Sequence, residues 1–295
     1  MTEQAAVDPI GRRNELTSTR RLPSLVIVGA ILFLVVAAMS AALADILAPY
    51  GYNDQNLLIR LKPPSFLGGP HGYYFGTDEL GRDVFSRVLF SLRFSLLIAI
   101  TGTLVGAGFG TLLGFLAAHF QGLWEDILSA LVDFQASIPF MIFALAALAF
   151  FGNSVFLFVI LLGLYGWEVY ARLVRGLVLS AKELGYVEAL RNLGFHPIRI
   201  YSRHVLPNIG GALLVQITLN FPGIILLESG LSFLGLGIQP PLTSLGLMIG
   251  SGREFMTTAW WTAVAPGTVI FLTALSVTLV GDWFRDRLDA AFELN

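Results

Sequence analysis

Cysteine is absent from this 295-residue chain, and charged residues are scarce. Without cysteine the chain has no disulfide, no thiolate metal ligand and no thiol nucleophile. Charged residues make up 13% of the sequence, which is about half the share found in soluble domains. So few charges cannot cover the surface of a compact soluble protein. Together with 55% hydrophobic residues and a mean hydropathy of +0.74, this scarcity indicates an integral membrane protein.

Signals for catalysis and ligand binding are also missing. The two lysines, Lys62 and Lys182, do not follow glycine in a phosphate-binding loop, so we do not expect the chain to hydrolyse ATP. The four histidines lack zinc-like spacing, and the apolar stretches carry neither paired carboxylates nor an activated nucleophile. We therefore expect no catalytic, cofactor-binding or metal site. The net charge of −2, without clustered basic residues, argues against a nucleic-acid partner.

Apolar stretches of about 20 residues span the hydrocarbon core of a bilayer as helices, because lipid offers no partner for a free backbone group. Six stretches qualify, at 23–47, 92–118, 127–151, 154–172, 211–236 and 260–284. We therefore predict an all-α polytopic membrane protein with six transmembrane helices. Its predicted parts are a tail 1–22, a first helix 23–47, a segment 48–91, a five-helix core 92–284 that includes a loop 173–210, and a tail 285–295.

The distribution of basic residues predicts the orientation of the chain. Two thirds of the 18 lysines and arginines fall on the side of both termini and of the loop 173–210. Cytoplasmic segments are enriched in these residues. We therefore expect both termini in the cytoplasm and the segment 48–91 outside, in a bacterial cytoplasmic (inner) membrane. The first stretch is about twice as long as the apolar part of a signal peptide, and we expect it to be retained.

A stripe of glycines marks the second stretch, where one occurs every four residues, at Gly102, Gly106, Gly110 and Gly114. Residues at this spacing share one face of a helix, and small side chains on that face let another helix approach closely. Proline interrupts the third and fifth stretches, at Pro139 and Pro222, and we expect a kink at each.

Acidic residues within apolar stretches are functional candidates by default. Asp133 and Glu168 lie near the predicted cytoplasmic ends, where we expect them at the interface or paired with Arg172 or Arg175. Glu228 lies deeper in the fifth stretch. It is either a polar contact on a transport pathway or a helix–helix hydrogen bond. An ion-coupled secondary transporter, the alternative class of protein, would use this carboxylate directly.

The outer segment contains a charged stretch at 76–88. Thr77 or Asp78 is suited to cap a helix there, and acidic residues in the first turn favour its dipole. An apolar face would be formed by Leu80, Val84 and Val88. We therefore predict an amphipathic helix lying on the membrane surface. Two interpretations stay open, namely a solvated interfacial helix with local Asp–Arg pairs, and a docking or gating element at the outer mouth.

The loop 173–210 is predicted to form two short helices joined by a turn. Gly194 is suited to the left-handed conformation that ends the first helix, and Pro197 to the first turn of the second. Pro207 is expected to end that second helix and to turn the chain back towards the membrane. The first helix has an apolar face formed by Leu184, Val187, Leu190 and Leu193. Such a helix at a cytoplasmic surface is able to pack into the groove of a partner.

Two motifs in these segments point to one family. The inner loop carries Glu-Ala, then a glycine, then Leu-Pro, as Glu188, Ala189, Gly194, Leu206 and Pro207. This spacing resembles the EAA loop in permeases of binding-protein-dependent ATP-binding-cassette (ABC) importers, although Leu190 replaces the second alanine and His204 an isoleucine. The outer motif is similar to that of the dipeptide/oligopeptide/nickel branch in Gly76, Thr77, Asp78, Gly81, Arg82 and Asp83. The resemblance covers roughly residues 75–290.

The resemblance implies a type I ABC importer permease fold with cytoplasmic coupling helices. It further implies a homologous second permease, two ABC ATPase subunits that bind ATP and Mg, and a periplasmic or extracellular substrate-binding protein. The residues of the EAA-like motif, including Leu190, would couple to the ATPase. Those of the outer motif would form a gate or a binding-protein contact. Peptides are the expected cargo, with nickel chelates or glycosides as alternatives.

Overall fold

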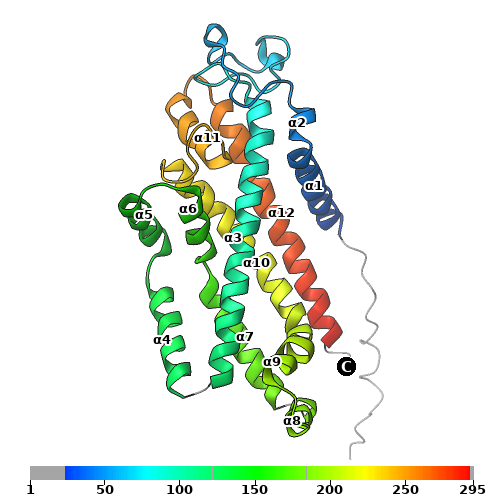
Figure 1. Cartoon of the computed structure of the whole chain (residues 1–295). Helices are drawn as coiled ribbons and strands as arrows, with labels where there is room; N and C mark the ends of the chain where they lie inside the picture. The colour runs from blue at the N-terminus through cyan, green and yellow to red at the C-terminus, as the bar shows by residue number, and fades with distance from the viewer. Residues whose placement is uncertain (1–23, 121, 184, 293–295) are drawn as a thin grey trace, which may run out of the picture.

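The polypeptide folds into a bundle of helices in a computed structural model that describes residues 24–120, 122–183 and 185–292 (Figure 1). Within these ranges the β-structure is a single bridge between Thr77 and Asp83. The predicted tail 1–22 lies outside the described residues. Five helical segments are long and apolar enough to cross a membrane, and a bent helix pair makes a sixth if its halves form one span. The predicted all-α fold with six spans agrees with this arrangement.

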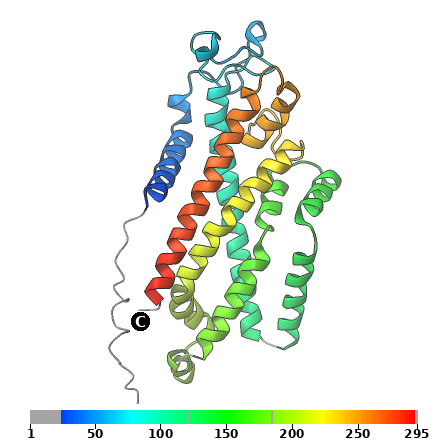
Figure 2. The ribbon, with the colours of Figure 1, turned by 180° about the vertical axis from the view of Figure 1, so that it is seen from behind.

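The long helices are α1 (Leu25–Ala42), α3 (Val84–Phe120), α7 (Trp167–Lys182), α10 (Leu206–Phe233) and α12 (Trp261–Phe292). The shorter ones are α2 (Ala44–Leu47), α4 (Leu123–Ser137), α5 (Phe140–Phe151), α6 (Val155–Gly163), α8 (Gly185–Asn192), α9 (Pro197–Ile200) and α11 (Leu245–Gly252). Figure 2 shows α12 and α10 side by side, with α1 at one edge of the bundle and α4 with α5 at the other. Residues 48–83 form a cap at one end of the bundle, and α8 and α9 lie at the opposite end.

The glycine stripe brings α3 into backbone contact with α6 and α7. A Cβ atom added at Gly106 would lie 2.6 Å from the carbonyl oxygen of Gly163, and one at Gly110 would lie 2.3 Å from that of Trp167. At Gly114 the corresponding distance to the carbonyl oxygen of Ala171 is 2.7 Å. No side chain fits at these distances. The predicted close approach is therefore confirmed. Two consecutive helices, α6 and α7, make it.

The third predicted span, 127–151, is divided into two helices rather than kinked. Helices α4 and α5 meet at 89°, with the break at Pro139. Ile138 has extended backbone angles, as residues before proline prefer, so α4 ends before the proline. The fourth predicted span, 154–172, also differs. It is broken between α6 and α7 by Gly166, whose φ is +80°, and α7 continues to Lys182.

The chain from Pro197 to Phe233 is one helical run, so the expectation that Pro207 ends a helix was wrong. Helix α9 passes through a π-helical turn, Tyr201–Val205, directly into α10. Pro207 lies at the start of α10, directly after the π-helical turn, and the helical run continues through it. Pro222 lies inside α10, which continues through it. The predicted tail 285–295 likewise belongs in part to α12, which extends to Phe292.

The glycine stripe can be tested by comparing two neighbouring glycines of α3. Gly110→Ala should destabilise the protein by about 1–3 kcal/mol, because the added methyl group meets backbone that cannot turn away. Gly108→Ala is the matched control, since nothing apart from its own helix backbone lies within 4 Å of the position that its Cβ would take. Both sites are helical, so intrinsic helix propensity cancels in the comparison. Thermal melting of the detergent-solubilised protein checks this prediction. Equal melting temperatures for the two variants would contradict it.

Candidate functional site

Asp78 is the centre of a buried ion network in the cap. Its Oδ2 accepts a hydrogen bond from Nε of Arg82 at 2.7 Å and is paired with Arg87, which projects from the first turn of α3. Its Oδ1 accepts from the backbone N–H groups of Leu80 and Arg82, each at 2.9 Å. Asp78 is 2% exposed and Arg87 4%. A buried carboxylate that faces two guanidinium groups and two N–H donors is fully compensated.

The backbone around this network is a tight turn closed by the bridge between Thr77 and Asp83. Gly76 and Gly81 have φ of +76° and +71°, a region that glycine enters without strain. Both are also packed against other backbone. A Cβ atom at Gly81 would lie 1.8 Å from the carbonyl oxygen of Asn56. The glycines of the outer motif are therefore required by the geometry of the turn.

Thr77 ties the turn to the rest of the cap and to α12. Its Oγ1 accepts a hydrogen bond from the backbone N–H of Lys62 at 2.9 Å, and its own N–H donates to the carbonyl of Lys62 at 3.0 Å. The indole Nε1 of Trp261, the first residue of α12, donates to the carbonyl of Thr77 at 3.1 Å. Thr77 therefore connects the cap, the start of α3 and the start of α12.

Asp83 caps the N-terminus of α3. Its Oδ2 accepts hydrogen bonds from the backbone N–H and the hydroxyl of Ser86, at 2.8 and 2.6 Å. Burial raises the pKa of the Asp83 carboxyl above its ordinary value, although the bonds from Ser86 favour the charged form. Its other oxygen is buried without a hydrogen-bond partner among the described residues. Asp83 therefore differs from Asp78, because ionisation of Asp83 is poorly compensated.

The predicted amphipathic helix at 76–88 was therefore wrong. The helix begins at Val84, and residues 76–83 form the turn. Leu80 does not share a helical face with Val84, and the polar residues of the motif are buried inside the cap. Asp78 stays outside the helix because its carboxylate is bonded to N–H groups within the turn. The turn brings the outer motif residues together, and their side chains face each other and not the solvent.

At the opposite end, α8 and α9 form the predicted helix–turn–helix. Gly194 has φ of +79°, and its N–H donates to the carbonyl of Arg191 at 3.0 Å. The N–H of Phe195 donates to the carbonyl of Leu190 at 3.2 Å. These two bonds form a Schellman motif, the termination that favours glycine at this position. Pro197 begins α9, as predicted.

Helix α8 is held on the bundle by one face and exposes the other. Val187 is buried, and Leu190 and Phe195 pack partly buried against the same apolar cluster, which includes residues of α7 and α10. Glu188 and Ala189 are exposed. One residue of the predicted apolar face does not fit this description, because Leu193 is 74% exposed. Leu184, also predicted on that face, lies outside the described residues.

The remaining EAA-like residues lie on a different element. Leu206 and Pro207 begin α10, which follows α8 in the chain after α9 and the π turn. Both are exposed, and Leu206 is 37% exposed. The motif therefore does not form one continuous helix. Its glycine shapes the turn, its Glu-Ala pair lies on the projecting helix, and its Leu-Pro pair lies where that segment joins the bundle.

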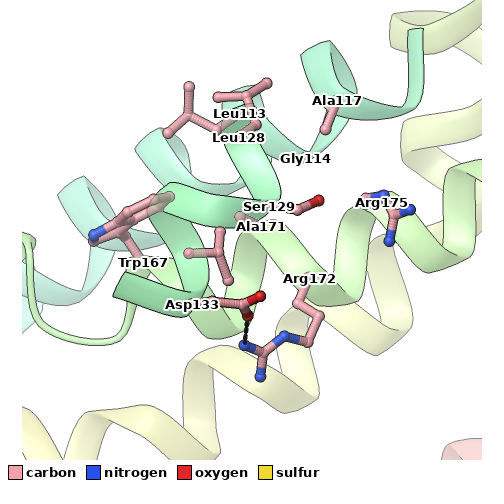
Figure 3. A pocket seen from close by; sticks show the side chains of 11 residues that line it. Leu113, Gly114, Ala117, Leu128, Ser129, Asp133, Trp167, Ala171, Arg172 and Arg175 are labelled. Carbon is pink, nitrogen blue, oxygen red and sulfur yellow. Dashed lines mark hydrogen bonds and ion pairs between the residues drawn. The ribbon is translucent and has the colours of Figure 1, made fainter. Parts of the chain in front are cut away.

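A cavity of about 170 Å³ separates α4 from α3 and α7 (Figure 3). An ion pair between Asp133 and Arg172 spans it at 3.3 Å, which confirms the pairing expected for that acid. Arg175 instead donates to Glu125 at 2.9 Å. The sequence contained no signal for this pair, since fifty positions separate its members. For Glu168, expected at the interface or paired with an arginine, one carboxylate oxygen is buried without a hydrogen-bond partner in the described part of the chain.

Glu228 is fully buried between α10 and its neighbours. Its carboxylate accepts hydrogen bonds from the hydroxyl groups of Ser95 on α3 at 3.1 Å and of Ser232 on α10 at 2.9 Å. Ser229 donates a third, at 3.2 Å. The structure therefore assigns Glu228 to a helix–helix hydrogen-bond network. The alternative role as a pathway contact does not fit a side chain enclosed within one chain.

These features define a polytopic helical membrane protein with a projecting helix–turn–helix. Among the described residues, no group of three His, Asp or Glu side chains could bind a metal ion. The family described as the binding-protein-dependent transport system inner membrane component matches residues 110–293. The chain belongs to this family of transport permeases and is a multi-pass protein of the inner membrane. The predicted family is thus confirmed.

Three relatives illustrate this membership. The di/tripeptide transport system permease protein DppC of Pseudomonas aeruginosa is 37% identical over 262 residues, which cover 88% of this chain and 86% of the relative. The glutathione transport system permease protein GsiD of Pectobacterium atrosepticum is 36% identical, with 92% and 88% covered. The oligopeptide transport system permease protein OppC of Escherichia coli K12 is 35% identical, with 89% and 86% covered.

A solved structure shows the same fold. A chain of the MetNI methionine ABC transporter in an inward-facing conformation aligns with a TM-score of 0.52 and 19% identity. The alignment covers 69% of this chain and 95% of that one. At this identity the similarity concerns the fold alone, and it confirms the predicted architecture of an ABC importer permease.

The two aspartates of the cap should respond differently to neutralisation. Asp78→Asn should lower the free energy of unfolding by about 3–5 kcal/mol, because buried Arg87 loses its counter-charge and Arg82 keeps only that of Glu79. Asp83→Asn should change it by less than about 1 kcal/mol, since the amide keeps an acceptor for Ser86. Because the pKa of Asp83 is raised, the wild type should lose stability relative to Asp83→Asn as the pH rises from the ordinary carboxyl pKa through the raised one. Thermal melts at several pH values check both results, and equal losses for the two variants would contradict them.

Proposed function

We propose that this chain is a transmembrane permease subunit of an ATP-driven, binding-protein-dependent importer of peptides. It forms half of the translocation pathway, and a homologous second permease forms the other half. The peptide assignment is supported by the relatives, which are named for the transport of di/tripeptides, glutathione and oligopeptides. None of these three relatives is named for the transport of nickel chelates or glycosides, the other cargoes of the resembling branch.

The energy comes from two ABC ATPase subunits, which bind ATP and Mg. This assignment follows from the family and from the sequence, because neither lysine stands in a phosphate-binding loop. A substrate-binding protein delivers the peptide from outside. In this arrangement both termini and α8 are cytoplasmic, and the cap is periplasmic or extracellular.

Helix α8 is the element that couples the permease to the ATPase. It projects from the end of the bundle, and Val187 fixes one of its faces to the core. Its exposed face presents Glu188, Ala189 and Leu193, an acidic and apolar surface that suits a groove on a partner. This geometry is the observation that carries the proposal. Movement of the ATPase at α8 is transmitted to α7 and α10, against which that buried face packs.

The outer motif acts by keeping the cap in shape. Because Thr77, Asp78 and Arg82 are buried, their side chains do not supply a contact surface. The cap itself exposes large apolar residues, with Leu58 at 90% and Phe66 at 71%. Exposed apolar side chains on a rigid support are suited to bind another protein. We assign these residues to the contact with the substrate-binding protein.

An ion-coupled secondary transporter fits the site less well. Such a carrier needs an acid that reaches the transport pathway. Glu228, the acid proposed for that role, is enclosed and hydrogen-bonded to serine hydroxyls. Uptake of a labelled dipeptide separates the two mechanisms. The importer keeps its uptake when a protonophore collapses the proton gradient, and it loses uptake when ATP is depleted.

The orientation can be measured directly, because the chain has no native cysteine to interfere with labelling. Leu58→Cys lies in the cap, and Leu193→Cys at the end of α8, both at highly exposed positions. A membrane-impermeant maleimide applied to spheroplasts should label Leu58→Cys and leave Leu193→Cys unlabelled until the membrane is permeabilised. The opposite pattern would invert the topology and separate α8 from any cytoplasmic ATPase.

Coupling through α8 should depend on the turn at Gly194. A β-branched residue in the left-handed region is strained by about 1–2 kcal/mol, so Gly194→Val should insert normally but shift α8. At 1.4 kcal/mol per factor of ten, we expect about a tenfold loss of substrate-stimulated ATP hydrolysis in reconstituted membranes. Glu188→Lys should lower transport and ATP hydrolysis together.

Gly185→Val is the matched control for this experiment. Gly185 lies at the start of the same helix and is not among the glycines with positive φ. Nothing apart from its own helix backbone lies within 4 Å of the position that a Cβ atom would take there. The variant should retain ATPase co-purification and stimulated hydrolysis. Wild-type coupling in both Gly194→Val and Glu188→Lys would show that α8 is not the ATPase contact.

A further inference from the structure

Two hollows meet behind α8, at the inner end of α3. The first is a cavity of about 410 Å³ between α3, α7, α8 and α9. Its polar lining consists of Lys182, Glu188, Arg191, His119 and Tyr201. The second is a groove of about 650 Å³ between the last turns of α3 and the run from α9 into α10. Its lining is mostly apolar and includes Leu112, Phe115, Leu116, Ile198 and Leu206.

The two hollows share part of their walls. His119, Pro197 and Tyr201 line both, and Nδ1 of His119 lies 3.0 Å from the hydroxyl of Tyr201. This polar pair therefore marks the point where the polar cavity passes into the apolar groove. A ligand that fills both hollows must be charged or polar at one end and apolar along the rest of its length.

The charge of the cavity favours an anion. Lys182 and Arg191 are two cations, and Glu188 is the single acid of the lining. Lys182 donates one hydrogen bond, to the carbonyl of Ala118 at the end of α3, and an ammonium group carries three donors. Arg191 makes no side-chain hydrogen bond or ion pair within the described ranges of the chain. Both side chains are therefore available to an incoming phosphate.

The position of the hollows agrees with that chemistry. Helix α3 carries no charged residue between Arg93 and its last turn and ends at Phe120, so His119 lies near the boundary between hydrocarbon and water. Basic pockets between transmembrane helices on the cytoplasmic side are suited to anionic lipid headgroups. The adjoining groove is lined by apolar residues from the last turns of α3, including Leu112, Phe115 and Leu116, which suit an acyl chain.

We propose that these joined hollows form a binding site for one anionic phospholipid, whose phosphate lies in the cavity between Lys182 and Arg191 and whose acyl chain lies in the groove. The lipid site rests on the proposed function for the cytoplasmic placement of α8, and its effect on coupling rests on the proposed role of α8 as the coupling helix. Because Glu188 and Arg191 of α8 line the cavity, occupancy by the lipid sets the position of the coupling helix. The site thus makes coupling sensitive to the lipid composition of the membrane.

The headgroup half of the site is tested by native mass spectrometry of the full-length chain in mild detergent. Phosphatidylglycerol should be retained in preference to phosphatidylcholine at equal concentration. The double variant Lys182→Gln/Arg191→Gln should retain about tenfold less phosphatidylglycerol and an unchanged amount of phosphatidylcholine. Arg203→Gln, which removes a cation from the same segment but from neither hollow, should behave as the wild type. Equal retention of the two lipids by the wild type would overturn the proposal.

The groove half is tested with Gly108→Leu. Gly108 lines the groove and has open space around it, so the leucine fills the groove without a clash. Retention of phosphatidylglycerol should fall in this variant and stay unchanged in Gly176→Leu, an equally open glycine of α7 outside both hollows. Inorganic phosphate should not displace the lipid. Unchanged retention in Gly108→Leu would overturn the proposal, and so would displacement by inorganic phosphate, which would indicate a site for a free anion.

The assay is independent of the transport function. Lipid retention is measured without ATPase or substrate-binding protein, so its failure leaves the permease assignment intact. Conversely, loss of coupling in Gly194→Val says nothing about the lipid. A melting temperature for each variant shows that it is folded before its lipid content is compared.

Discussion

Direct contact between the backbone of α3 and the backbones of α6 and α7 is the constraint on which the bundle depends. Glycine at 106, 110 and 114 removes the side chains of α3 from this contact. In a membrane, burial from water does not drive helix association, so close van der Waals packing has to do so. Helix α3 also reaches both ends of the protein, since Arg87 in its first turn binds Asp78 of the cap and Ala118 near its last turn accepts from Lys182. A displacement of α7 at its inner end is therefore resisted along the whole length of α3.

The sequence predicted those parts of the fold that depend on local pattern. Spans follow from apolar length, the glycine stripe from its spacing, and the turn at Gly194 from the conformational freedom of glycine. The outer motif shows where local pattern fails. A helix cap followed by charged residues at helical spacing describes both an amphipathic helix and the observed turn. Partners that are distant in the sequence select the turn, since Lys62 and Trp261 bind Thr77 and keep residues 76–83 out of the helix that begins at Val84.

The sequence also underestimated how sharply the third span is broken, because this too depends on packing partners that are distant in the sequence. Proline at 139 predicts a kink, but the angle of 89° between α4 and α5 depends on what each helix packs against. The expectation for Pro207 failed in the opposite direction, because this proline does not end a helix. A π turn lies just before it, and the helical run continues through it. For the site residues, the sequence grouped the members of each motif by their spacing. It contained no information on burial, which separates the supporting role of Asp78 from the exposed role of Glu188.

The interactions that hold α4 differ in kind from those that hold α7. Helix α7 is fixed to α3 by backbone contact, where a single methyl group is excluded. Helix α4 buries one residue, Val132, and is tied to α7 by the pairs Asp133–Arg172 and Glu125–Arg175. The first of these pairs is largely exposed, and an exposed pair contributes about 0–1 kcal/mol. The right-angle break at Pro139 removes the covalent stiffness that a continuous helix would add. The bundle therefore contains a closely packed unit of α3, α6 and α7 to which α4 is attached far more weakly, so a rearrangement of the helices costs least at α4.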